Sequence, residues 1–120
     1  MTQILVVDDS PTEIHVLKTI LEKNGYTVLV ASSGEEGVTM AKQRRPDLVL
    51  MDVVMPGLNG FQATRQLAND AATSAIPVIV VTTKDQETDK VWAMRQGAKD
   101  YIVKPVKERD LMERVKALVG

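Results

Sequence analysis

An aspartate lies within an almost entirely apolar stretch of the chain, Leu48–Pro56, which reads LVLMDVVMP. A buried carboxylate without a partner is costly, because the charged group loses its hydration. Asp52 must therefore either reach the surface at the end of a strand or have neighbours for which its charge is useful. This stretch makes Asp52 the first candidate for a chemical role.

Three other apolar runs are also followed by charged or hydroxyl side chains. Asp8 and Asp9 follow ILVV (4–7), Thr82 and Thr83 follow PVIVV (77–81), and Lys104 follows YIV (101–103). If the runs are strands of one parallel sheet, their carboxyl ends meet at one edge, where such sheets bind ligands. The sequence therefore predicts carboxylates, a hydroxyl and an ammonium group at one site.

Three carboxylates at one site repel one another. At an effective dielectric constant near 20, each pair about 4 Å apart costs about 4 kcal/mol. Lys104 offsets one negative charge, and the remainder requires a divalent cation or raised carboxylate pKa values. Because the ligands are oxygens and few in number, Mg²⁺ is the cation that fits best.

A carboxylate beside Mg²⁺, a lysine and a hydroxyl can attack a phosphoryl group and become an aspartyl phosphate. Such a transfer needs mostly positioning and neutralisation of charge on the phosphoryl oxygens. We assign the attack to Asp52, charge neutralisation to the metal and Lys104, and a hydrogen bond to Thr82. The only histidine, His15, is predicted to face solvent and to take no part.

Five runs rich in β-branched residues predict the strands that position these groups. They cover residues 4–7, 26–31, 48–51, 77–81 and 101–103, and their nearly unbroken apolar character is typical of parallel strands covered on both faces. Strands that alternate with helices predict an α/β fold. We expect a doubly wound five-stranded parallel sheet of order 2-1-3-4-5 with five helices, in a single domain over residues 1–120.

Amphipathic stretches between these runs predict the five helices. Ser10 caps the first, with Glu13 as its capping-box glutamate, and Asn24-Gly25 ends it. A second capping box, Ser33–Glu36, begins a helix that runs to about Arg44. The other helices are expected from Asn59 to about Asn69, from about Gln86 to Gln96, and at the C-terminal end. The expected buried residues include Ile14, Val16, Leu17, Ile20 and Leu21 in the first helix and Leu111, Met112, Val115, Leu118 and Val119 in the last.

Composition excludes several classes of function. With 15 basic and 16 acidic residues among 120 and a net charge of −1, nothing indicates nucleic-acid binding. The absence of cysteine excludes disulfides and thiolate sites. The N-terminal residues do not form a signal peptide, and no apolar run approaches membrane-spanning length. We therefore expect a cytoplasmic protein without membrane insertion.

Four motifs together resemble the receiver domain of bacterial response regulators, which has the CheY-like, flavodoxin-like fold. They are VDDS (7–10), LVLMDVVMPGLNG (48–60), VIVVTT (78–83) and GAKDYIVKP (97–105). The resemblance implies that Asp52 accepts the phosphoryl group. It also implies that Asp9, Asp52 and the carbonyl of Val54 bind Mg²⁺ directly, that Asp8 helps through water, and that Lys104 pairs with the phosphoryl oxygens.

The same resemblance implies a switch and its partners. Thr82 would move toward the phosphoryl group and Tyr101 would change rotamer with it, while the Lys104–Pro105 bond would be cis. A histidine kinase of the chemotaxis type would donate the phosphoryl group. A downstream protein would bind the face made by the fourth helix, fifth strand and fifth helix. The chain would be a phosphoacceptor that catalyses only its own phosphorylation and dephosphorylation, not an enzyme with a separate substrate.

Further stretches resemble the stand-alone regulators of type IV pilus twitching motility, which belong to chemotaxis-like pathways. They are DDSPTE (8–13), MPGLNGFQATRQL (55–67) and TTKDQETDKVWAMRQGAKDY (82–101). Because the sequence ends just after the last predicted helix, we expect the output to be a protein contact or the draining of phosphate from a shared kinase.

Three alternatives remain open from the residues alone. A small Mg²⁺-dependent phosphatase would form the same aspartyl phosphate, but it usually needs a second acid where this chain has Val54. A nucleotide or flavin module would need glycines or hydroxyls after the first strand, where DDSPT would repel an anion. A pure adaptor would never be phosphorylated.

Overall fold

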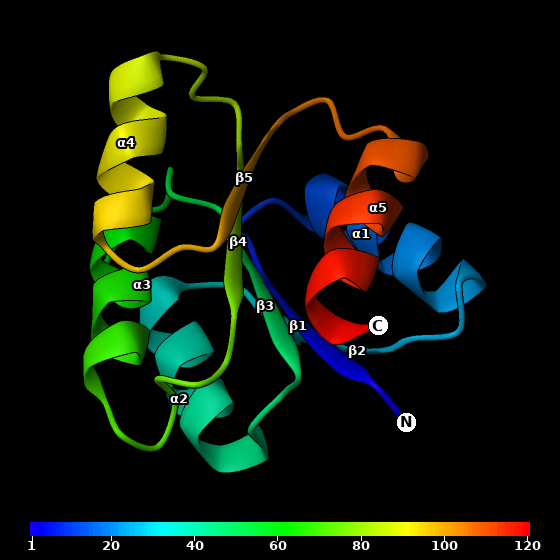
Figure 1. The fold of residues 1–120 in the computed structure, drawn as a ribbon, viewed down its shortest axis with the longest axis horizontal. Helices are drawn as coiled ribbons and strands as arrows, with labels where there is room; N and C mark the ends of the chain where they lie inside the picture. Colours follow the sequence, from blue (N-terminus) through cyan, green and yellow to red (C-terminus); the bar gives the residue numbers. More distant parts are fainter.

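Five strands alternate with five helices in the computed structural model, which describes residues 1–120 (Figure 1). The strands are β1 (Gln3–Val7), β2 (Thr27–Ala31), β3 (Leu48–Met51), β4 (Val78–Thr82) and β5 (Asp100–Val103). The helices are α1 (Pro11–Lys23), α2 (Gly34–Arg44), α3 (Gly60–Asn69), α4 (Glu87–Arg95) and α5 (Glu108–Val119). The predicted order of elements is confirmed, and their predicted ends differ from these by only one or two residues.

All five strands are parallel, in the order β2-β1-β3-β4-β5. This confirms the predicted sheet. The winding reverses between β1 and β3, and Val7 of β1 is in register with Met51 of β3. The residues that follow these two partners therefore leave the sheet side by side, at the edge where ligands bind in this type of fold.

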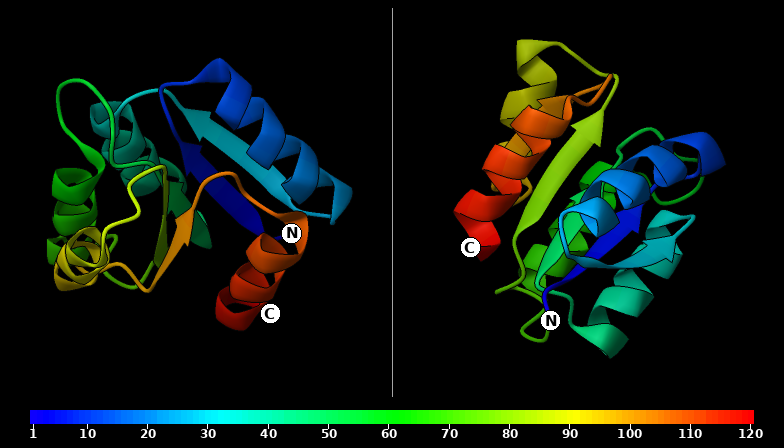
Figure 2. Two further views of the ribbon diagram at one scale, coloured as in Figure 1. Left: turned by 90° about the horizontal axis from the view of Figure 1, so that it is seen from above. Right: turned by 90° about the vertical axis from the view of Figure 1, so that its right-hand side faces the viewer.

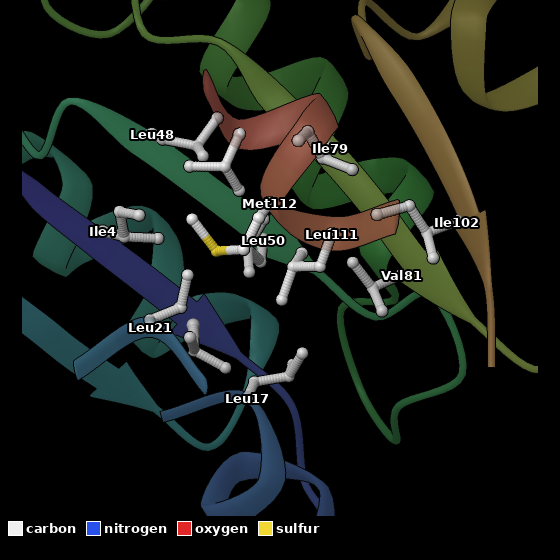
Figure 3. Close-up of a cluster of buried hydrophobic side chains, with 12 residues drawn as sticks. Ile4, Leu17, Leu21, Leu48, Leu50, Ile79, Val81, Ile102, Leu111 and Met112 are labelled. Carbon is white, nitrogen blue, oxygen red and sulfur yellow. The ribbon is translucent and has the colours of Figure 1, made fainter. Parts of the chain in front are cut away.

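The helices form a layer on each face of the sheet. Helices α1 and α5 cover one face, and α2, α3 and α4 cover the other (Figures 1 and 2). Alternate residues of each strand therefore enter different cores. Figure 3 shows the core under α1 and α5, where Leu17, Leu21 and Leu111 meet strand residues such as Leu50 and Ile79. The opposite core contains residues such as Val7, Met51 and Leu67.

Two predicted core residues are in fact exposed. Val16 is 39% exposed and Leu118 is 36% exposed, whereas Leu17, Leu21 and Val115 are buried. Val16 is one position from Leu17, so it lies about 100° around the helix from it and at the margin of the buried stripe. Leu118 is one position from Val119, which packs against the core in the same turn of α5, so it lies about 100° around the helix from that contact. His15 is exposed, as predicted.

The helix caps differ from the predictions in one respect. Ser10 and Ser33 accept hydrogen bonds from the backbone N–H groups of Glu13 and Glu36, as N-caps do. The reciprocal bond of a capping box forms only in α3, between Asn59 and Gln62. In α1, the N–H of Ser10 donates instead to the Oδ1 atom of Asp8, at 2.9 Å. The carboxylate of Glu13 is therefore free for another contact.

The sheet has β2 and β5 at its two edges. Four of the five residues of β2 are only partly buried, in contrast to the fully buried β3 and β4. The sequence does not distinguish β2 from the central strands, because its run of apolar residues is equally unbroken. None of the helices is long and apolar enough to span a membrane.

Candidate functional site

Three carboxylates meet at the carboxyl edge of the sheet. Asp8 and Asp9 follow β1 and Asp52 follows β3, and one oxygen from each lies within 4.8 Å of the others. Asp8 and Asp52 are buried, whereas Asp9 is exposed. The topology thus brings together residues more than 40 positions apart, because β1 and β3 are neighbours in the sheet.

The backbone holds the two buried carboxylates in place. The N–H of Asp8 donates to the carbonyl of Ala31 at 3.1 Å, and the N–H of Asp52 donates to the carbonyl of Val7 at 2.9 Å. These bonds continue the sheet ladder past the strand ends. The N–H of Val54 also donates to Oδ1 of Asp52, at 3.1 Å. Asp52 is therefore oriented before any ligand binds.

Lys104 is the cation of the site. Its Nζ atom lies 2.7 Å from Oδ2 of Asp8 and 3.3 Å from Oδ2 of Asp52, and its side chain is only 7% exposed. The Lys104–Pro105 bond is cis, and the N–H of Lys104 donates to the carbonyl of Thr82 at 2.8 Å. The loop after β5 thus places the ammonium group between the two buried carboxylates.

Burial and ion pairing shift the pKa values of Lys104 and Asp8 in opposite directions. Burial is the largest influence on Lys104 and would lower its pKa, but hydrogen bonds and charge from Asp8 and Asp52 outweigh it, so the pKa is raised. Burial is also the largest influence on Asp8, and it raises the pKa of this carboxyl group despite the opposing effect of Lys104. The ion pair with Lys104 therefore does not fully offset the effect of burial on the Asp8 carboxyl group.

The residues present fit a small divalent cation. The cluster has three carboxylates, of which the buried ammonium group contacts only those of Asp8 and Asp52, and every candidate ligand is an oxygen. Oxygen ligands of this kind suit hard ions such as Mg²⁺. A second positive charge would also reduce the repulsion among the three carboxylates.

Thr82 of β4 and Tyr101 of β5 form no hydrogen bond with the carboxylates. The hydroxyl of Thr82, a buried residue at the end of β4, accepts a hydrogen bond from the N–H of Lys84 at 3.4 Å. The hydroxyl of Tyr101 donates to the carbonyl of Lys84 at 2.8 Å. Burial, followed by the charges of Asp89, Asp52 and Asp85, raises the pKa of Tyr101 to about 12. Both side chains thus contact the backbone of one residue in the loop before α4.

Val54 lies two residues after Asp52 and is 50% exposed. Its side chain carries no group that transfers a proton. Its backbone is tied to Asp52 through the N–H bond described above. The role of its carbonyl as a metal ligand stays a prediction.

Glu13 is a site residue that the sequence interpretation missed. Its Oε2 atom lies 3.6 Å from Nζ of Lys104. The sequence interpretation assigned this carboxylate to a capping box, a local contact three residues long. The place of Glu13 in the sequence also indicates that it lies near the site, because the first turn of a helix that directly follows β1 must lie at the carboxyl edge of the sheet.

Gly60 allows the chain to pack closely behind Asp52. A Cβ atom at this position would overlap the carbonyl oxygen of Asp52 and crowd the Cα atom of Val53, both of which are backbone atoms. We expect Gly60→Ala to lower the free energy of unfolding by about 3 kcal/mol, as overpacking against a rigid neighbour does. Urea denaturation measures this loss.

Gly25 provides the matched control for that variant. It has a φ of +89° with no atom within 4 Å of an added Cβ, so Gly25→Ala should cost only about 1 kcal/mol, from backbone conformation. If the two variants lost equal stability, close packing behind Asp52 would not be the reason.

Comparisons with known proteins give a consistent result. The sequence profile of the response regulator receiver domain matches residues 4–116. The chain is 64% identical over 120 residues to Protein PilH of Pseudomonas aeruginosa, and the match covers 100% of this chain and 99% of that protein. It is 40% identical over 117 residues to the alkaline phosphatase synthesis transcriptional regulatory protein PhoP of Bacillus subtilis, covering 98% of this chain and 48% of that protein.

Solved structures show the same fold. The chemotaxis protein CheY4 of Vibrio cholerae matches with a TM-score of 0.92 and 27% identity over 98% of each chain. The receiver domain of the sensor histidine kinase PA1611 of Pseudomonas aeruginosa, solved with a magnesium ion coordinated in its active site cleft, matches with a TM-score of 0.92 and 30% identity, covering 99% of this chain and 98% of that one. The family match, the full-length relative and the shared fold agree: this chain belongs to the family of response regulator receiver domains of two-component systems.

Proposed function

We propose that the chain is a signalling switch in which Asp52 accepts a phosphoryl group from a histidine kinase with the help of Mg²⁺. The observation that supports this most is the meeting of Asp8, Asp9 and Asp52 within 4.8 Å of one another, with Lys104 on two of them. A fixed carboxylate beside a buried ammonium group is suited to phosphoryl transfer.

Asp9, Asp52 and the carbonyl of Val54 would hold the Mg²⁺ ion directly, and Asp8 would hold it through water. The bound ion would supply positive charge at the phosphoryl oxygens. Support for this assignment comes from the oxygen-only ligand set and from the magnesium ion in the related PA1611 receiver domain.

The chain's own residues would carry out the transfer. An oxygen of Asp52 attacks the phosphorus of a phosphohistidine on the kinase, the O–P bond forms and the N–P bond breaks. The leaving imidazole nitrogen keeps the electron pair and takes a proton from solvent. Lys104 would neutralise charge on the transferred group, because it already lies 3.3 Å from the acceptor carboxylate.

The added negative charge would then change the neighbouring loop. Thr82 would turn its hydroxyl toward the phosphoryl group, and it would give up the weak bond from the N–H of Lys84. Tyr101 would respond because its hydroxyl holds the same residue. The phosphoryl group would thus shift an existing equilibrium between two arrangements of this loop.

The signal would leave through the face formed by α4, β5 and α5. Four large apolar side chains are exposed on α4 and β5: Val91, Trp92, Met94 and Val103. Exposed apolar groups of this kind favour protein contacts. We place the chain in the cytoplasm and, from its similarity to PilH, in type IV pilus twitching motility or related chemotaxis-like signalling.

A separate phosphatase function is not supported. Such an enzyme usually needs a second acid two residues after the nucleophile, where this chain has Val54. We therefore propose that the chain catalyses only its own phosphorylation and dephosphorylation.

The direct test is to incubate the purified protein with acetyl phosphate and Mg²⁺ and to measure its intact mass. We expect one added phosphoryl group, located on Asp52 by peptide mapping, and no addition without the metal. Phosphotransfer from a panel of histidine kinases of the same genome then identifies the donor. An unmodified protein under all these conditions would contradict the proposal.

Lys104→Ala separates charge neutralisation from metal binding. The variant should bind Mg²⁺ at least as tightly as the wild type, because the ammonium group no longer competes for Asp8 and Asp52. Its phosphorylation should be slower by roughly 100-fold, the cost of removing one group that stabilises transition-state charge. Calorimetric Mg²⁺ titration and the acetyl phosphate assay measure the two effects.

Lys107→Ala is the control, because it removes an exposed lysine, and it should change neither the Mg²⁺ affinity nor the rate of phosphorylation. If Lys104→Ala were phosphorylated at the wild-type rate, Lys104 would have no part in the mechanism.

A further inference from the structure

Glu13 is a fourth carboxylate near the site, and it contacts the cation rather than the acidic cluster. Its Oε2 atom lies 3.6 Å from Nζ of Lys104. The three-carboxylate group that could hold a metal ion does not include it. Its contact is therefore with the lysine alone.

The structure fixes Glu13 in this position. Its N–H donates to Oγ of Ser10 at 3.3 Å, and the N–H of Ser10 donates to Oδ1 of Asp8 at 2.9 Å. The first turn of α1 is thereby joined to the acidic pair. Because Asp8 occupies the N–H that a capping box would offer to Glu13, the Glu13 carboxylate turns to Lys104 instead.

Lys104 consequently divides its charge among three carboxylates. Nζ is 2.7 Å from Asp8, 3.3 Å from Asp52 and 3.6 Å from Glu13. An incoming phosphoryl group at Asp52 needs the same ammonium group. Glu13 competes with the phosphoryl group for the positive charge of Lys104. The Glu13 carboxylate also repels the phosphoryl oxygens, because two negative groups that contact the same ammonium group lie close together.

We propose that Glu13 is a positioning residue that slows the phosphorylation of Asp52 by holding part of the charge of Lys104. The inference rests on the proposed function, since it concerns the same acceptor. Glu13 does not touch the transferred group and acts through Lys104. Its side chain is 37% exposed, so the effect is moderate and dissolved salt weakens it.

Glu13→Gln tests this inference, because it removes the charge and preserves the shape of the side chain. The rate of phosphorylation by acetyl phosphate at saturating Mg²⁺ should rise roughly two- to fivefold at low ionic strength, the range of a partly exposed ion pair. In high salt the wild-type rate should approach that of the variant. Beryllium fluoride, an unreactive phosphoryl mimic, should bind the variant more tightly by a similar factor in calorimetry.

Glu22→Gln is the matched control, because Glu22 is an exposed glutamate in the same helix with no ion pair to a lysine or arginine. It should leave the rate, its salt dependence and the mimic affinity unchanged. If the wild type is phosphorylated on Asp52 but Glu13→Gln is equally fast or slower, the inference about Glu13 is wrong and the proposed function stands. If Glu22→Gln accelerates the reaction as much, the effect reflects net charge and the inference is also wrong. If the wild type takes no phosphoryl group on Asp52, both proposals fail.

Discussion

Replacing Asp52 with asparagine should reduce phosphorylation by acetyl phosphate to less than about one hundredth of the wild-type rate, because an amide is not a nucleophile for phosphorus. The fold should persist, since Oδ1 of the asparagine can still accept the hydrogen bond from the N–H of Val54. Stability without metal should even rise slightly, because one of three mutually repelling charges is lost. Intact-mass spectrometry and urea denaturation measure the two properties.

The comparison for this variant is Asp110→Asn, which changes an exposed aspartate in α5. It should be phosphorylated like the wild type. Two results would show that Asp52 is not the acceptor: wild-type incorporation by Asp52→Asn, or a phosphoryl group mapped to Asp8 or Asp9 in the wild type.

Replacing Asp9 with alanine should have the second largest effect, on metal affinity. Asp9 is the exposed member of the acidic cluster and has no contact with Lys104, so its charge is the one most available to a cation. Losing it should weaken Mg²⁺ binding by about 100-fold, which corresponds to about 2.7 kcal/mol. Because Asp9 takes part in no packing contact of the core, the unfolding midpoint should not fall.

Isothermal titration calorimetry with Mg²⁺ measures this loss. Glu35→Ala, which removes another exposed carboxylate at the start of α2, should retain wild-type affinity and thus exclude a general effect of net charge. A wild-type dissociation constant in Asp9→Ala would contradict the assignment of Asp9 as a ligand.

The fold could be predicted because several independent signals agree for each element. LVLM predicts a buried strand over 48–51, and the structure has β3 with these bounds. Ser10 and Pro11 set the start of α1, and Gly25, with a φ of +89°, follows its end. Where propensity, periodicity and turn residues point to the same element, tertiary contacts rarely overrule them.

The exposed positions of Val16 and Leu118 could not be predicted in the same way. Periodicity gives the direction of a side chain around the helix axis. It does not give the extent of the surface that the helix packs against, which depends on the crossing of helix and sheet.

The candidate site could likewise be predicted only in part. Strand order alone places Asp8, Asp9 and Asp52 at one edge, because β1 and β3 are neighbours. The contact between Glu13 and Lys104 was not predictable from a local pattern. Two acceptors compete for the N–H of Ser10, and the outcome depends on where the side chain of Asp8 lies in the folded chain.

The half-buried strand β2 has a consequence for the behaviour of the protein at high concentration. Its sequence, TVLVA, is uncharged and rich in β-branched residues, and one side of its backbone has no partner strand. Segments of this kind stack readily between molecules and seed fibrils when they become accessible. Helices α1 and α2 contact β2 from the two faces of the sheet, so resistance to aggregation depends on both helices staying packed against this strand.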